Sequence, residues 1–155
     1  ELLARSLFFF SALSFFILLH GIRASSAQSF FPFFFMEANN ANAEFLNPSH
    51  DLFLHPSDNP NNILVNELLN GRNYATWKKS MEIALIAKNK LGFVLGSTPQ
   101  PETEPQQNQW NRCDKMVISW ILHAVEKRIS DSILFSNSSK QIWLDLEQRF
   151  GQSDG

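Results

Sequence analysis

The chain has 155 residues, which is room for one compact domain, and its formal net charge of −2 at pH 7 excludes a strongly basic protein that coats nucleic acid by bulk electrostatics. Its single cysteine, Cys113, excludes an internal disulfide and a multi-cysteine zinc site within these residues. Because Cys113 falls on an apolar helical face, we expect a buried, unreactive thiol.

Residues 1–35 differ in composition from the rest, since they hold ten of the fifteen phenylalanines. One interpretation is a translated pyrimidine-rich leader, with Met36 as the true start. The other is a secretory signal peptide, with Arg5 before an apolar run and a small-residue cleavage site ending at Ala27. The second cluster of phenylalanines, after the cleavage site, favours the leader. Either way we expect this segment to lie outside the fold.

Residues 36–62 are predicted to form a disordered or extended arm. The stretch "MEANNANAEF" has no apolar period, and "HPSDNPNN" is rich in turn-forming residues. The next run, "ILVNELL", leaves two alternatives open: the β-branched Ile63 and Val65 favour a strand, whereas its last three residues could begin a helical turn. We therefore expect a short strand pair at most.

A first helix is predicted after "NGRN", with Asn73 as its N-cap and with Lys88, Lys90 and Gly92 marking its end. One face of this helix is apolar, at the spacing of a core stripe. That face comprises Tyr74, Trp77, Met81 and Leu85. The following "GFVLG" is predicted to be a short extended piece between two glycines.

Three further helices are predicted towards the C-terminus. A long one covers about 106–126, with Thr103 and Gln106 in capping-box spacing and with Trp110 and Trp120 on its broad apolar face. A short one lies around "ISDSILF". A last one runs from Ser138 or Ser139 to residue 150, with Ser138 and Gln141 in capping-box spacing and with Trp143 and Phe150 on its buried stripe. The prediction is an all-α domain of about four helices over residues 63–151.

The sequence offers no constellation for catalysis. His50, Asp51 and His55 lie in a turn-rich segment without a further strong metal ligand nearby, and Glu102 and Glu104 lie in a Pro-rich linker where we expect them to be solvated. Phosphate loops, nucleophile elbows and zinc-protease helices are absent from the sequence. We therefore predict a protein that is not an enzyme, with no catalytic, cofactor-binding or metal-binding residues and no small-molecule substrate.

The stretch "WKK" raises the alternative of a nucleic-acid-binding module that uses Lys78, Lys79, Lys88 and Lys90. Lys78 and Lys79 lie about 100° and 200° around the helix from Trp77, so they do not frame its ring, and Lys78 is expected to pair with Glu82. A core position for Trp77 is therefore favoured. On the back of the same helix, Ile83 and Ile86 form a second apolar patch, for packing against the arm or against another copy.

Several separated stretches carry a family resemblance: "LNGRNYATWKKSMEIAL", "AKNKLGFVLGS" and "QWNRCDKMVISWILHAVEKRISDSILFSNSSKQIWLDLEQRFGQSDG". In this order they resemble the N-terminal Gag (gag-polypeptide) region of plant copia-type LTR retrotransposons, from about Asn47 to Gly155. The residues expected to form the core or the family motif are Leu69, Gly71, Tyr74, Trp77, Met81, Leu85, Trp110, Trp120, Trp143 and Phe150.

The resemblance implies a non-enzymatic structural Gag fragment that contributes to capsid-like self-assembly, in cytoplasmic virus-like particles around the element's RNA. Ile83 and Ile86 are the candidates for self-association with other Gag copies. In such polyproteins the zinc knuckle that grips RNA lies downstream, so RNA binding by this chain is expected to be weak. The secretory pathway and contact with a membrane remain the alternative if residues 1–35 act as a signal peptide.

Overall fold

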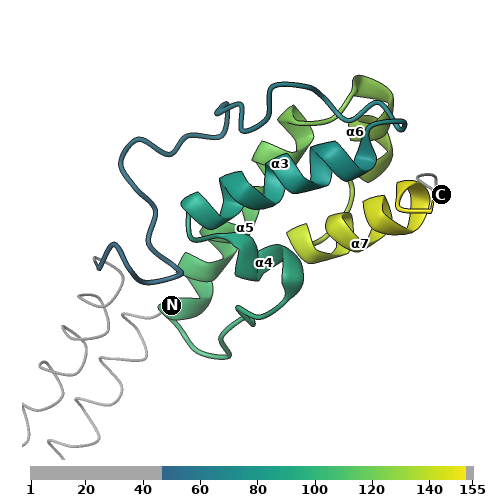
Figure 1. Ribbon diagram of the computed structural model, residues 1–155. Helices are drawn as coiled ribbons and strands as arrows, with labels where there is room; N and C mark the ends of the chain where they lie inside the picture. The colour runs from purple at the N-terminus through teal and green to yellow at the C-terminus, as the bar shows by residue number, and fades with distance from the viewer. Residues whose placement is uncertain (1–46, 153–155) are drawn as a thin grey trace, which may run out of the picture. The chain divides into compact units, whose positions relative to one another are not determined.

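A computed structural model describes residues 47–152, and in this part of the chain it contains five helices and no named strand. The predicted all-α class is confirmed, with one helix more than expected (Figure 1). The helices are α3 (Tyr74–Ala87), α4 (Leu91–Leu95), α5 (Gln106–His123), α6 (Lys127–Ile133) and α7 (Ser139–Phe150). The leader and residues 36–46 of the predicted arm lie outside the described residues.

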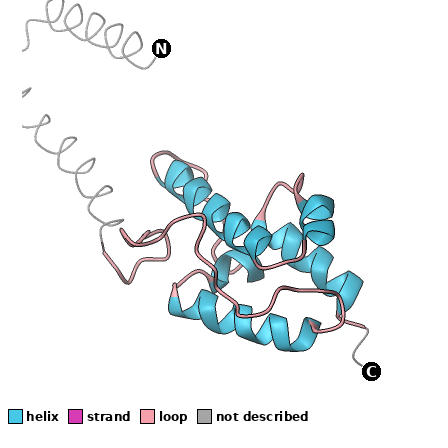
Figure 2. Cartoon of the chain, turned by 90° about the horizontal axis from the view of Figure 1, so that it is seen from above, coloured by secondary structure: helices cyan, strands magenta, loops and turns pink. Residues whose placement is uncertain are grey.

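The core forms where α7 packs against both α4 and α5, with α3 packed against α4. Val117, Trp120 and Ile121 of α5 are fully buried, and α7 contributes Ile142 and Leu146, both with no exposed surface. The irregular segment before α3 runs the length of the helices before it turns into α3 (Figures 1 and 2). The centre of the molecule is therefore the apolar face of α5, as its sequence pattern indicates.

Helix α3 begins where predicted, but Asn73 does not cap it through its side chain. The side-chain amide of Asn73 instead bonds to residues that precede the helix. Its Oδ1 accepts from Asn70 N at 3.0 Å and its Nδ2 donates to Leu68 O at 3.0 Å. These bonds close the turn around Gly71, whose φ of +89° suits a glycine. Asn73 therefore fixes the approach to the helix rather than its first turn.

The prediction of an extended piece at "GFVLG" is wrong, because residues 91–95 form helix α4. Phe93 and Val94 are buried, and α4 packs mainly on α7. Gly96 ends the helix with a φ of +78°, the left-handed conformation typical of helix C-termini. A five-residue helix is too short to show a helical period, and its contacts with α7 determine its conformation.

Helix α5 ends at His123, three residues before the predicted end at Glu126. Here the chain turns extended, because Leu69 N donates to Ala124 O and Glu126 N donates to Leu69 O, each at 3.0 Å. This single parallel bridge, Leu69↔Val125, is all that the described residues show of the expected strand pair. This bridge joins the segment just before α3 to the residues that follow α5.

The two predicted capping boxes have different outcomes. At α7, Ser138 Oγ accepts from Gln141 N at 3.3 Å, and the cap is present as expected. At α5 the helix starts after Pro105 without a side-chain cap, and Thr103 Oγ1 lies 3.5 Å from the Gln106 side chain. Thr103 supports this end of the helix only through its carbonyl, which accepts from Gln107 N.

Candidate functional site

The aromatic residues of the opening helix lie inside the core. Trp77 is 2% exposed and its Nε1 donates to Ala124 O at 2.7 Å. Its ring lies 6.2 Å from that of Tyr74 and 5.7 Å from that of Trp143. Because base stacking needs an accessible ring face, Trp77 is not placed to bind nucleic acid.

The other residues expected in the core or motif also lie near this cluster. Leu69, Met81, Leu85 and Trp120 are buried. Trp110 and Phe150 are partly buried against the core, and Trp110 Nε1 donates to Thr98 O at 3.0 Å. A side chain on Gly71 would come within 3.2 Å of the Phe150 ring, so this glycine allows α7 to end close to the turn before α3.

The four lysines of the nucleic-acid alternative do not form a free basic surface. Lys78 pairs with Glu147 of α7, and Lys88 pairs with Asp58 of the arm while its ammonium lies 5.7 Å from the centre of the Trp120 ring. The predicted pair between Lys78 and Glu82 is therefore replaced by a contact between helices.

Lys90 is 1% exposed, and its Nζ donates to Phe53 O at 2.7 Å. Burial lowers the pKa of this lysine, and the nearby Cys113 opposes that effect. Lys79 is exposed. With three of the four ammonium groups bonded within the domain, the nucleic-acid alternative is not supported.

The outer face of α3 carries exposed apolar side chains. Ile83 is 57% exposed and Ile86 is 60% exposed. The described part of the arm, residues 47–62, leaves both side chains exposed. Large exposed side chains of this kind are typical of protein interaction surfaces when they cluster.

Sequence reasoning missed other exposed apolar residues of the described region. Phe135, 89% exposed, projects between α6 and α7, and Leu144 on α7 is 47% exposed. The remaining ones are Ile63, Leu68, Leu95 and Leu134. Apolar residues at the ends of short helices look like core residues in the sequence, and no periodic signal distinguishes the exposed ones.

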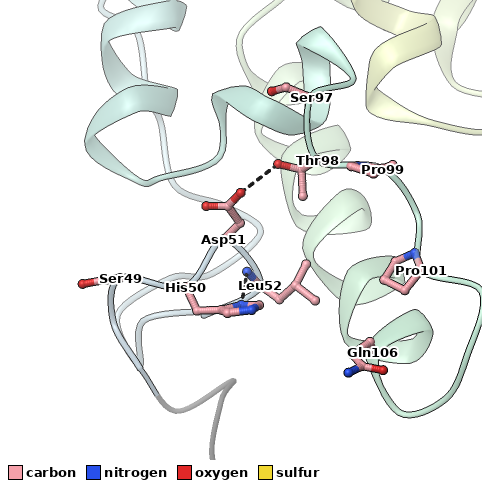
Figure 3. Close-up of a pocket in the computed structure, with 9 residues that line it drawn as sticks. All are labelled: Ser49, His50, Asp51, Leu52, Ser97, Thr98, Pro99, Pro101 and Gln106. Atoms are coloured by element: carbon pink, nitrogen blue, oxygen red, sulfur yellow. Dashed lines mark hydrogen bonds between the residues drawn. The ribbon is translucent and has the colours of Figure 1, made fainter. Parts of the chain in front are cut away.

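A hollow of about 510 Å³ lies between the arm and the connection from α4 to α5 (Figure 3). Asp51 and Thr98 face each other across it, with Thr98 Oγ1 donating to Asp51 Oδ2 at 3.0 Å. His50 Nδ1 accepts from Leu52 N at 3.0 Å. The polar groups of this hollow therefore hold the arm to the helices, and they are not arranged as a nucleophile with its base.

The histidines and carboxylates of the arm are likewise used locally. His55 Nδ1 lies 2.7 Å from Ser57 Oγ, and Asp58 Oδ2 accepts from His55 N at 3.0 Å. Within residues 47–152 there is no cluster of three histidine, cysteine or acidic side chains that could hold a metal ion. Nor does any helix of that region have the length and apolar character to cross a bilayer.

Comparison with known proteins agrees with the resemblance seen in the sequence. Residues 55–102 match the family model described as Gag-polypeptide of LTR copia-type. The chain is 27% identical over 90 residues to the retrovirus-related Pol polyprotein from transposon RE2 of Arabidopsis thaliana. It is 24% identical over 90 residues to the corresponding polyprotein from transposon RE1 of the same plant. The predicted resemblance to copia-type Gag is thereby confirmed, and the family model locates it at residues 55–102.

The extent of these matches is limited. In both cases the alignment covers 52% of this chain and 6% of the relative. No solved structure matches the chain. The similarity therefore concerns a small Gag-like segment of much longer polyproteins.

Proposed function

We propose that this copia-type Gag domain is a structural module that self-associates through the outer face of α3 and contributes to a shell around the element's RNA. The family match supports the Gag role, and the exposure of Ile83 and Ile86 supports the choice of face. Assembly in the cytoplasm follows from the family resemblance. The module itself performs no reaction, and the enzymes belong to other parts of such polyproteins.

The proposal rests on one observation: α3 has two apolar faces, one buried in the core and one exposed. Tyr74, Trp77, Met81 and Leu85 account for the core, so stability of the monomer does not require isoleucine at positions 83 and 86. Covering a fully exposed isoleucine contributes about 1.5–3 kcal/mol, and roughly half of that is available at Ile83 and Ile86, which are 57% and 60% exposed. Two such residues on one face can therefore stabilise a contact between copies of the chain.

The test is sedimentation velocity of the 155-residue chain over a range of concentrations. We expect reversible oligomers, and we expect the double variant Ile83→Asp/Ile86→Asp to need at least about tenfold more protein for the same association, since 1.4 kcal/mol is a factor of ten. The control is Phe135→Asp, which charges an even more exposed apolar residue outside α3.

Circular dichroism and thermal melting show that each variant keeps its fold. A monomer at all concentrations would contradict self-association. Oligomers that survive the α3 substitutions but disappear in Phe135→Asp would instead assign the contact to the region between α6 and α7.

A further inference from the structure

The contact between the arm and the helical core has an unusual chemistry. Of the arm, the structure describes residues 47–62, and the name is used for these residues below. Side chains of the core donate hydrogen bonds to main-chain carbonyls along the whole length of the arm. Three of these bonds are Asn89 Nδ2 to Ser49 O at 3.2 Å, Gln109 Nε2 to Leu52 O at 2.7 Å and Lys90 Nζ to Phe53 O at 2.7 Å. Further along, Trp120 Nε1 donates to Asn59 O at 2.8 Å and Ser119 Oγ to Pro60 O at 3.0 Å. These donors bind main-chain carbonyls of the arm rather than its side chains.

Few side chains of the arm are buried. Leu52 is 4% exposed, whereas Phe53 and Leu54 are only partly covered. The arm's own backbone bonds are short turns, such as Phe53 N to His50 O at 2.9 Å and Asp58 N to His55 O at 2.8 Å. The arm's internal turns do not depend on the core, and its docking rests on the buried Leu52, the partly buried Leu54, the ion pair of Asp58 with Lys88 and a row of hydrogen bonds.

The connection behind the arm is suited to act as a hinge. Ile63 is 75% exposed and Asn61 is exposed, while the chain is fixed again at Val65, which is 5% exposed, and at the Leu69 bridge. A change of backbone direction at residues 61–63 would therefore leave Val65 and the Leu69 bridge in place, and Leu64, which packs against the core, marks the end of the hinge.

We propose that the groove which holds the arm also accepts the arm of a second copy of this chain, so that two copies exchange residues 47–62. Exchange regains every donor–carbonyl bond and the burial of Leu52, so the cost is limited to association and to the rearranged hinge. The exposed Ile63, within the hinge, and Leu68, after it, gain a partner surface when two hinges meet. This contact does not involve the outer face of α3 and does not rest on the proposed function.

The experiment uses thiol cross-linking between the arm and the groove. Asp51 and Thr98 touch through their side chains, so Asp51→Cys on the arm and Thr98→Cys on the core are within reach of a short bifunctional thiol reagent. The natural Cys113 is fully buried, and burial raises its pKa to about 11, so it does not compete. The double variant Asp51→Cys/Thr98→Cys is the positive control for docking.

The decisive sample mixes chains that carry only Asp51→Cys with chains that carry only Thr98→Cys. A cross-link between them requires the arm of one copy to lie in the groove of the other. The collision control mixes Asp51→Cys with Lys127→Cys, an exposed position on α6 beyond the opposite end of α5. We expect the decisive mixture to give about tenfold more cross-linked dimer than the control, because docked thiols have a far higher effective concentration.

Equal yields in the two mixtures, with the double variant cross-linked only within one chain, would overturn arm exchange. Failure of the double variant to cross-link at all would overturn the docking geometry and the proposal with it. The same mixture in an Ile83→Asp/Ile86→Asp background separates the two contacts, since arm exchange is expected to persist there even if the α3 contact is lost.

Discussion

Trp77 is the residue that best separates a core role from a binding role. Its ring is buried between Tyr74 and Trp143, and its indole N–H is bonded to Ala124 O. We expect Trp77→Ala to lower the free energy of unfolding by about 3–5 kcal/mol, through lost contacts and the cavity left behind.

Urea denaturation followed by circular dichroism measures this loss. Thr76→Ala, at the exposed neighbouring position, is the control and is expected to change stability by no more than about 0.5 kcal/mol. A loss below about 1 kcal/mol in Trp77→Ala would indicate that the ring is not part of the core.

Tyr74 gives a prediction about pH. Its hydroxyl is buried and has no hydrogen-bond partner among the described residues, and burial, with smaller effects of Glu147 and Glu82, raises its pKa to about 12 from 10.0. The unfolded chain releases this proton near pH 10 and the folded chain does not, so stability is unaffected below pH 10 and falls between pH 10 and 12.

Removing the hydroxyl in Tyr74→Phe should abolish this part of the alkaline loss, on the order of 2–3 kcal/mol. At neutral pH the variant should be as stable as the original chain or slightly more stable, because an unsatisfied buried hydroxyl is removed. Thermal melts of both proteins from pH 8 to 12 measure the difference. Parallel curves would show that Tyr74 is ionised or hydrogen-bonded in the folded state.

At the scale of elements, the start of α7 depends on two side chains with different roles. Ser138 caps the helix from outside, whereas the buried Asp114 of α5 accepts from Ser139 N at 2.9 Å and from Ser139 Oγ at 2.7 Å. We expect Ser138→Ala to cost about 1 kcal/mol. Asp114→Ala should cost more, roughly 2–3 kcal/mol, because it removes charge-assisted bonds and leaves buried donors unpaired. Urea denaturation of both variants measures how much free energy of unfolding each substitution removes. A larger loss in Ser138→Ala than in Asp114→Ala would contradict this prediction.

The helices differ in how far the sequence could predict them. The buried stripes of α3, α5 and α7 follow from the spacing of aromatic and aliphatic residues, and the structure places those helices there. The prediction of an extended segment is wrong at α4 because its five residues include Gly92, are followed by Gly96 and are too few to show a helical period. The position of α4 depends on α7, about 45 residues later in the chain, and such a contact leaves no local signal.

At the scale of the whole molecule, the arm should open more readily than the helices. Asp58, whose side chain is 3% exposed, pairs with Lys88 and helps to hold the arm. In hydrogen-exchange mass spectrometry we expect peptides from residues 50–60 to exchange faster than those of α5. Asp58→Asn should accelerate hydrogen exchange in the arm further and leave the exchange rates in α5 unchanged. Equal loss of protection in both regions would show that arm and helices unfold as one unit.

The sequence by itself determined the helical class, the core face of α3 and the copia-type Gag relationship, since these depend on residue spacing within short segments. Only the tertiary structure decided the partners of the lysines: Lys78 meets Glu147, Lys88 meets Asp58, and Lys90 is buried beneath Phe53 O. The physical reason is that a long charged side chain bonds to whatever the fold brings within reach. Lys88 and Lys90, which look like part of a basic cluster in the sequence, therefore help to attach the arm to the helices. Ile83 and Ile86 remain exposed on the outer face of α3.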